Sequence, residues 1–155
     1  MDFRLKDFVR GLKEGFGESL SGVILYGSRA RGEAVASSDY DVFILIDGSL
    51  PKSPFKRSKL IMSKIKDRKN INFILRTKAE FETSFPSLYL DLALDGKVLF
   101  DKKDYVKCKL ERIKELLREA GLVREKRSYG FGWYWKKVPV KFPWKIDWEG
   151  VDAIF

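Results

Sequence analysis

The residues best suited to chemistry lie in one short stretch between two apolar runs. Gly27 and Ser28 follow the first run, and Asp39 and Asp41 stand at the start of the second. Two carboxylates one residue apart on a strand point to the same face of a sheet, where they can hold a divalent cation. A pair of small residues that opens a helix exposes backbone N–H groups, which attract phosphate. The spacing therefore predicts a phosphate cradle facing a metal site, which is the equipment needed to handle a nucleoside triphosphate.

Two arginines follow the small pair and fit the same chemistry. Arg29 and Arg31 lie in the next turn, where their guanidinium groups could neutralise phosphate charge. Alone, a D-x-D pair more often supplies a turn residue and the ion-pair partner of an arginine. The agreement between the strands, the glycine–serine pair, the arginines and the spacing favours a nucleotide site. The nucleotide-binding candidates are Gly27, Ser28, Arg29 and Arg31, and the metal-binding candidates are Asp39 and Asp41.

Apolar periodicity indicates which elements position these residues. Thr77 and Glu80 form a capping-box pattern that starts a helix. Asp101 fits the cap of the last long helix, and Gly121 fits its end. The order of elements predicts an α/β (α+β) fold, with a small mixed β-sheet flanked by helices. Strands are expected at 21–27, 39–47, 70–76 and 97–100, and helices at 2–18, 28–34, 55–68, 77 onward, 86–94 and 101–120.

The chain length of 155 residues fits one domain with a substantial core. Residues 1–120 are expected to form this domain, and residues 121–155 an aromatic, basic tail that packs on the domain or on a partner. In the tail, several aromatic side chains stand among cations between positions 127 and 137. The pattern fits a hairpin that covers the core, a protein interface or, less favoured, a surface that stacks nucleic-acid bases.

Composition excludes several kinds of site. The sequence has no histidine, which excludes histidine triads and histidine metal sites, and the single Cys108 excludes an internal disulfide. No apolar run approaches the roughly 20 residues of a membrane span, and the amphipathic N-terminus is not typical of a secretory signal. We therefore expect a cytoplasmic protein without a membrane partner, with Cys108 in or beside the core. Abundant Lys, Arg and Glu without Gln are typical of thermophile proteins.

The formal net charge of +9 favours phosphate-bearing partners. The cations are spread along the chain instead of forming one block, so a solvated, ion-paired surface is an equally good interpretation. The helix at 55–68, with Arg57 among its cations, is expected to present such a solvated face. The sequence leaves homo-oligomerisation open.

The stretch YGSRARGEAVASSDYDVFILI resembles the minimal nucleotidyltransferases of the DNA polymerase beta superfamily. Their pattern is a glycine–serine pair, ten further residues and D-x-D, and the resemblance covers residues 20 to about 100. It implies a polymerase beta-like nucleotidyltransferase fold that uses ATP as substrate with Mg²⁺ or Mn²⁺. Some members act as antitoxins that transfer AMP to a tyrosine of a HEPN ribonuclease. The resemblance therefore also implies a HEPN-like protein partner.

One departure from the family pattern affects the chemistry. The family places a third carboxylate on the next strand, and in this sequence that position aligns with Asn72. An amide oxygen can coordinate a metal, but it is neutral and a poor proton acceptor. Loss of this carboxylate could lower the rate by a factor of about 100 to 10,000, the usual range for a general base. Asp91 or Asp95 could approach the site from elsewhere in the fold.

Three hypotheses follow from these observations. The first is a metal-dependent nucleotidyltransferase that moves AMP onto a hydroxyl of a partner protein, with Asp39, Asp41 and Asn72 at the catalytic centre. The second is a degenerate module, catalytically weak or inactive, that binds a HEPN-like partner by contact alone. The third, which is not favoured, is a nucleic-acid-binding protein that uses the basic surface and the aromatic tail.

Overall fold

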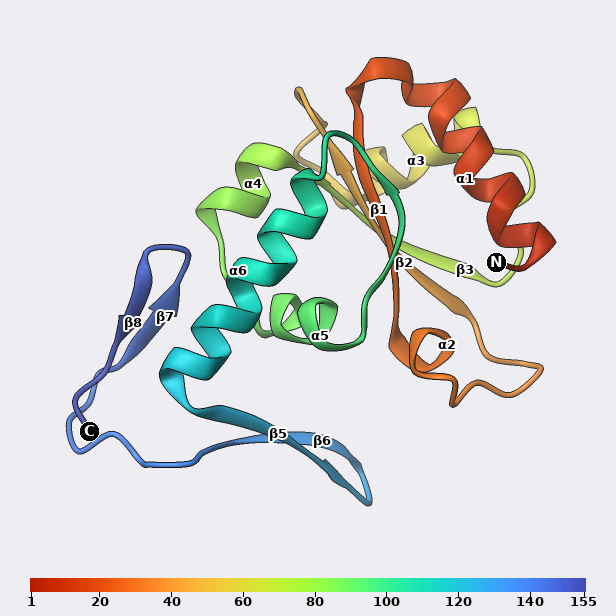
Figure 1. The fold of residues 1–155 in the computed structure, drawn as a ribbon. Coiled ribbons are helices and arrows are strands. Elements are labelled where there is room, and N and C mark those ends of the chain that lie inside the picture. The colour runs from red at the N-terminus through yellow and green to blue at the C-terminus, as the bar shows by residue number, and fades with distance from the viewer.

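The computed structural model describes residues 1–155, which form six α-helices, one 3-10 helix and eight strands (Figure 1). The helices are α1 (Phe3–Phe16), η1 (Gly17–Ser19), α2 (Gly27–Arg31), α3 (Pro54–Lys64), α4 (Lys78–Thr83), α5 (Ser87–Asp95) and α6 (Tyr105–Ala120). The strands are β1 (Leu20–Tyr26), β2 (Tyr40–Ile46), β3 (Ile71–Thr77), β4 (Lys97–Asp101), β5 (Leu122–Arg127), β6 (Gly130–Trp135), β7 (Lys145–Asp147) and β8 (Gly150–Asp152). No helix combines the length and the apolar character that crossing a bilayer requires.

Strands β1 to β4 form one sheet in the order β3-β2-β1-β4, which confirms the predicted mixed sheet. β1 runs antiparallel to both of its neighbours, whereas β2 and β3 are parallel. This topology brings the end of β1 beside the starts of β2 and β3. Tyr26 is paired with Asp41, and Asp41 is paired with Asn72, so these three residues stand in register across three strands.

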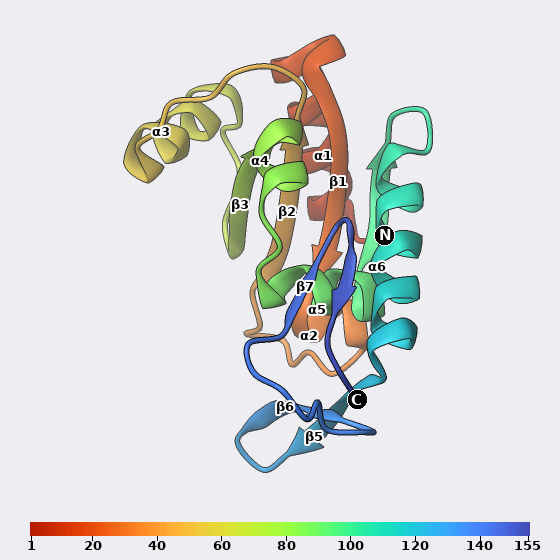
Figure 2. The same ribbon diagram turned by 90° about the vertical axis from the view of Figure 1, so that its left-hand side faces the viewer.

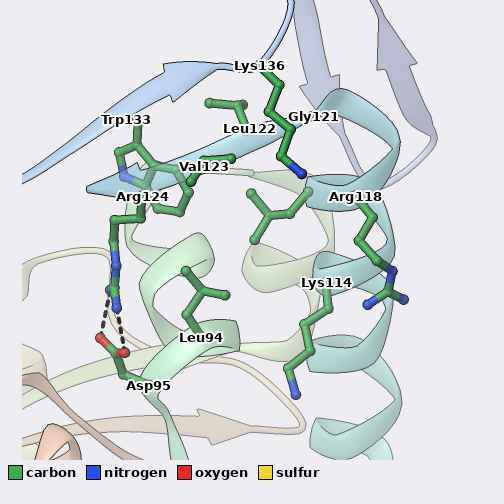
Figure 3. A pocket seen from close by; sticks show the side chains of 11 residues that line it. Leu94, Asp95, Lys114, Arg118, Gly121, Leu122, Val123, Arg124, Trp133 and Lys136 are labelled. Atoms are coloured by element: carbon green, nitrogen blue, oxygen red, sulfur yellow. Dashed lines mark hydrogen bonds and ion pairs between the residues drawn. The ribbon is translucent and has the colours of Figure 1, made fainter. Parts of the chain in front are cut away.

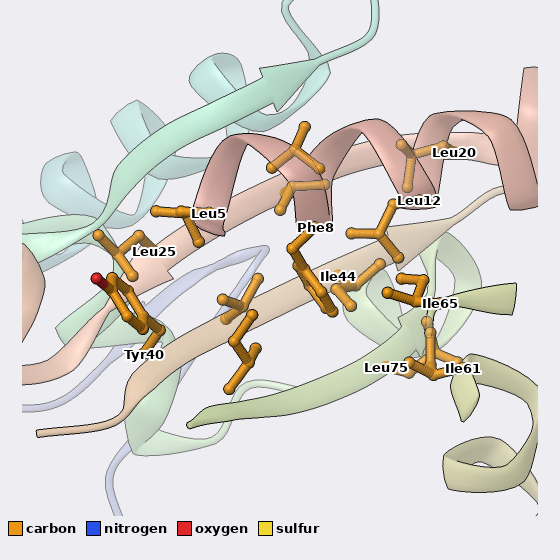
Figure 4. Close-up of a cluster of buried hydrophobic side chains, with 14 of the residues drawn as sticks. Leu5, Phe8, Leu12, Leu20, Leu25, Tyr40, Ile44, Ile61, Ile65 and Leu75 are labelled. Carbon is orange, nitrogen blue, oxygen red and sulfur yellow. The ribbon is translucent and has the colours of Figure 1, made fainter. Parts of the chain in front are cut away.

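Helices cover both faces of this sheet (Figure 2). α1 and α3 pack on one face, and α4, α5 and α6 pack on the other. Val42 and Ile44 of β2 enter the first cluster, whereas Phe43 and Leu45 enter the second. The central strands therefore read as continuous apolar runs, because both of their faces are buried. Figure 4 shows the first cluster, in which Phe8 of α1 lies over the sheet.

The sequence signals that end or begin helices are confirmed by their hydrogen bonds. Thr77 and Glu80 form the expected capping box at the start of α4. The carboxylate of Asp101 accepts from the backbone N–H groups of Val106 and Lys107 at 2.8 and 2.9 Å, and so caps α6 from outside the helix. Gly121 ends α6 in the left-handed conformation, with φ of 64°.

The chain after α6 folds into two hairpins, β5–β6 and β7–β8. The sequence pattern does not predict β5, because LVREKR lacks apolar alternation and depends on pairing with β6. Trp148, between β7 and β8, packs on Phe81 and Phe85 with ring centroids 5.1 Å apart in each case. Its indole N–H donates to the carbonyl oxygen of Phe81 at 2.8 Å. The division of the chain at residue 120 stays a prediction.

Two side chains lie where the sequence pattern does not place them. Arg57 in α3 is only 8% exposed, so the expectation of a solvated basic face is wrong at this position. Its guanidinium group donates to both carboxylate oxygens of Glu80, at 2.5 and 2.9 Å, and to the carbonyl oxygens of Pro51 and Leu75. Cys108 is exposed on α6, so its expected place in or beside the core is also wrong. The apolar positions of α6 turn this residue toward solvent.

Replacing Arg57 with Ala should lower the free energy of unfolding by about 3 kcal/mol, because four hydrogen bonds of a buried cation are lost together. Chemical denaturation with urea measures the change. Lys56→Ala is the matched control on the same helix, since Lys56 is exposed and should cost under about 0.5 kcal/mol. Equal effects of the two substitutions would show that the Arg57 contacts contribute nothing.

The same ion pair predicts a pH dependence. The hydrogen bond from Arg57 lowers the pKa of Glu80 below its ordinary value of 4.5. Because the folded-state pKa is depressed, the stabilisation is present above the unfolded pKa and is lost as the pH falls through the folded pKa. The stability difference between the wild type and Arg57→Ala should therefore stay constant above about pH 5 and shrink below it. Denaturation curves from pH 3 to pH 7 measure this difference.

Candidate active site

The two predicted metal ligands and Asn72 converge at one end of the sheet. Asp39 directly precedes β2, and Asp41 is the second residue of that strand. The side-chain N–H₂ of Asn72 on β3 lies 3.2 Å from Asp39 Oδ2 and 3.4 Å from Asp41 Oδ1. Asp39 and Asn72 are exposed and Asp41 is half-buried, so the group is open to solvent. The structure therefore brings together the three residues that the sequence placed at the catalytic centre.

Gly27 joins β1 to α2 directly against Asp41. Its φ is +72°, a backbone conformation that residues with a side chain rarely adopt. A Cβ atom at this position would lie 2.4 Å from Asp41 Oδ2. Only glycine allows the backbone to approach the carboxylate so closely. Ser28 follows as the second residue of α2. Gly27 therefore lies beside Asp41, as the spacing predicts.

Arg29 stabilises the loop that carries Asp39, a structural role that the sequence pattern does not predict. Its guanidinium group donates to the carbonyl oxygen of Ser38 at 2.7 and 3.0 Å. It also stacks on the ring of Tyr40, with the guanidinium carbon 4.1 Å from the ring centroid. Ser38 and Tyr40 flank Asp39, so Arg29 holds the loop that presents this carboxylate. These contacts use Nε and Nη2, and Nη1 has no partner among them, so phosphate binding by Arg29 stays a prediction.

Arg31 is held more loosely, between two carboxylates and an aromatic ring. Its Nε lies 3.0 Å from Glu33 Oε2, and its Nη1 lies 3.5 Å from Asp95 Oδ2. The guanidinium carbon lies 4.9 Å from the centroid of Phe131 on β6. Nη2 has no partner among these contacts, so part of the guanidinium group is free to meet a ligand. The sequence analysis places Phe131 only in the aromatic tail, because no local spacing links it to a residue 100 positions earlier in the chain.

No third carboxylate joins Asp39 and Asp41. Asp91 and Asp95, the two alternatives weighed from the sequence, are both paired with Arg124, at 2.9 Å and 2.6 Å. The protein contains no group of three His, Cys, Asp or Glu side chains arranged to hold a metal ion. The third position of the centre is thus the amide of Asn72.

Tyr26 is the other titratable group beside Asp41. Burial raises the pKa of its phenol to about 12, and the negative charge of Asp41 acts in the same direction. The hydroxyl group therefore stays protonated at neutral pH and cannot act as a general base. It is available as a hydrogen-bond donor at the edge of the site.

The donor set suits a hard divalent cation. Two carboxylates and one amide oxygen are the oxygen ligands that Mg²⁺ and Mn²⁺ prefer. Asn72 turns its N–H₂ group toward both aspartates, where it offsets part of their mutual repulsion. Rotation of the amide by half a turn would present its oxygen to a cation instead. The residues therefore fit one cation through Asp39 and Asp41, with Asn72 as a neutral third ligand.

The chain is similar to known proteins in both sequence and fold. Residues 14–105 match the family model described as "Polymerase beta, Nucleotidyltransferase". A protein of Methanocaldococcus jannaschii, named "Putative protein adenylyltransferase MJ1305", is 30% identical over 120 residues, which cover 74% of this chain and 81% of the relative.

Two solved structures share the fold. A chain from a crystal structure of a toxin–antitoxin with AMP-PNP has a TM-score of 0.52 at 16% identity, covering 73% of this chain and 86% of the other. A chain from the toxin–antitoxin MntA–HepT has a TM-score of 0.50 at 13% identity, covering 76% and 87%. Gly27 lies against Asp41, and the family model spans both residues together with Ser28 and Asp39. The chain therefore belongs to the polymerase beta nucleotidyltransferase family.

Proposed function

We propose that this protein transfers AMP from ATP to a hydroxyl group of a partner protein, with Mg²⁺ or Mn²⁺ bound at Asp39 and Asp41. The observation that supports the proposal is the close approach of Gly27 to Asp41, because it sets the turn proposed to bind phosphate against the pair proposed to bind the cation. The name of the Methanocaldococcus jannaschii relative supports AMP as the group transferred and protein as the acceptor. The toxin–antitoxin origin of the two structural neighbours supports a HEPN-like partner.

Each residue of the site has a part in this proposal. Asp39 and Asp41 hold the cation, which supplies neutralisation of the triphosphate and polarisation of the α-phosphorus when it is bound. The Ser28 hydroxyl donates to a phosphate oxygen, and Gly27 lets the backbone come close to the phosphate chain. Arg31 offers its unpaired Nη2 to the triphosphate.

Asn72 makes the proposed enzyme slow. The acceptor hydroxyl must lose its proton as it attacks, and a neutral amide accepts protons poorly. Tyr26 stays protonated, and Asp91 and Asp95 are paired with Arg124. The proton must therefore pass to water or to a phosphate oxygen of ATP, both of which are weaker bases than a positioned carboxylate.

A second candidate function is a degenerate module that binds the partner by contact alone. The observation that favours it is the pair of hydrogen bonds from Asn72 to both aspartates. These bonds partly satisfy the two carboxylates without a cation, so the site has less need of a metal than one with three carboxylates. The two functions differ in whether label from ATP reaches the partner.

Removing the divalent cation should abolish most ATP binding by the wild type. Asp39 and Asp41 repel the triphosphate unless a cation lies between them, so chelation should weaken ATP affinity by at least about tenfold, or 1.4 kcal/mol. Isothermal titration calorimetry with Mg²⁺ and with EDTA measures the affinity. Asp41→Asn should weaken the Mg²⁺-dependent binding.

Asp47→Asn is the matched control for this measurement. Asp47 follows the opposite end of β2 and lies 3.9 Å from Lys78, away from the candidate site. The Asp47→Asn substitution should therefore leave ATP affinity unchanged. Equal affinity of the wild type in Mg²⁺ and in EDTA would refute the metal assignment.

Asn72→Asp should restore the third carboxylate and raise the rate of AMP transfer about 100-fold or more. Label from α-³²P-ATP on a HEPN-like partner protein measures the rate. The double variant Asp41→Asn/Asn72→Asp should label nothing, because the restored group still needs its neighbouring metal ligand. A fast wild type that Asn72→Asp leaves unchanged would point to another base. If no variant labels the partner although all bind ATP with Mg²⁺, the degenerate module is the better account.

A further inference from the structure

The β5–β6 hairpin reaches back to α2, the short helix that follows the candidate phosphate turn. Arg124 of β5 binds Asp95, and the ring of Phe131 of β6 contacts the guanidinium groups of Arg31 and Arg124. Lys126 of β5 lies 2.9 Å from Glu33, just beyond α2. Arg124 also pairs with Asp91 at 2.9 Å, and Phe131 contacts Arg124 within the hairpin. The other contacts end on Arg31 or on one of its two carboxylate partners, Asp95 and Glu33.

Asp95 could capture Arg31 in the absence of the hairpin. Its carboxylate is only 9% exposed, so water screens it weakly and it needs a cation. Arg124 donates to both of its oxygens, at 2.6 and 2.7 Å, as Figure 3 shows. Arg31 reaches the same carboxylate only at 3.5 Å. Asp95 therefore forms its stronger, bidentate ion pair with Arg124 and only a long contact with Arg31.

The same arrangement holds at the other carboxylate and at the ring. Glu33 shares its charge between Arg31 and Lys126, each of which binds a different oxygen. The Phe131 ring carries Arg124 at 4.1 Å and Arg31 at 4.9 Å, so it supports both guanidinium groups. Arg31 is thus oriented by the hydrogen bond from its Nε to Glu33, while its contact with Asp95 stays long and its Nη2 has no acidic partner.

We propose that Arg124 is a positioning residue, which satisfies Asp95 and so keeps Arg31 available to the triphosphate of ATP. This inference rests on the proposed function, because it takes Arg31 as a phosphate ligand. The inference also means that the β5–β6 hairpin contributes to nucleotide binding, although the hairpin lies beyond the 14–105 segment that the family model matches. Without Arg124, Asp95 draws Arg31 into a close pair and removes it from the phosphates.

Arg124→Ala should weaken Mg²⁺-dependent ATP binding about tenfold, because the interaction of Arg31 with phosphate is lost. Calorimetric titration with ATP and with adenosine measures the effect, and adenosine affinity should stay unchanged because it has no phosphate. The decisive variant is Asp95→Asn/Arg124→Ala, in which the competing charge is also removed. It should regain most of the ATP affinity of the wild type.

Arg118→Ala is the matched control. Arg118 lines the same pocket as Arg124, on α6, but Figure 3 shows that it points away from Asp95. Its removal should leave ATP affinity unchanged. Thermal unfolding of every variant establishes that it is folded before its affinity is compared.

The outcomes separate this inference from the proposed function. If the wild type does not bind ATP with Mg²⁺, both are wrong. If the wild type binds and Arg124→Ala binds equally well, only the inference is wrong. If Arg124→Ala is weakened and the double variant is not restored, Arg124 acts through the fold and the inference is again overturned. Should Arg124→Ala fail to fold, Asp95→Asn alone decides: its ATP affinity should equal or exceed that of the wild type, and a loss would refute the competition.

Discussion

The site depends on the close contact between the backbone at Gly27 and the carboxylate of Asp41. No side chain fits between them, since a Cβ atom would lie 2.4 Å from the carboxylate oxygen. The contact arises because β1 runs antiparallel to β2, so that the end of one strand meets the start of the other. β3, parallel to β2, adds Asn72 at the same level. Three consecutive strands of the chain therefore bring their candidate functional residues to one corner of the sheet.

The intramolecular partners of each arginine determine how much positive charge this corner can offer to a ligand. Arg29 donates to the loop that carries Asp39, and Arg57 forms an ion pair with Glu80 in the fold. Arg124 pairs with Asp95, which leaves Arg31 with only a long contact to that carboxylate. The net charge of +9 is thus a poor guide to phosphate binding. The pairing of individual guanidinium groups decides which of them can meet a ligand.

Asn72 sets the chemical character of the centre. Its N–H₂ group bridges Asp39 and Asp41, so the two carboxylates partly share a neutral donor where relatives of this fold are expected to place a third negative charge. In the proposed enzyme, fewer negative charges would weaken the binding of a cation and leave no strong proton acceptor for the attacking hydroxyl. In the proposed function, the Asn72 amide is therefore the feature on which the choice between a slow adenylyltransferase and a binding module depends.

The sequence by itself determined the features that a few neighbouring residues can specify. The capping box of Thr77 and Glu80, the end of α6 at Gly121 and the glycine–serine and D-x-D spacing needed no distant partner. Tertiary structure alone decided the burial of Arg57 and the pairing of Arg124 with Asp95, because each needs a partner more than 20 positions away. It also decided that β5 is a strand, since LVREKR has no pattern of its own and takes its form from β6. Local propensity acts through adjacent residues, whereas ion pairs and strand pairing are specified only when folding brings separate segments together.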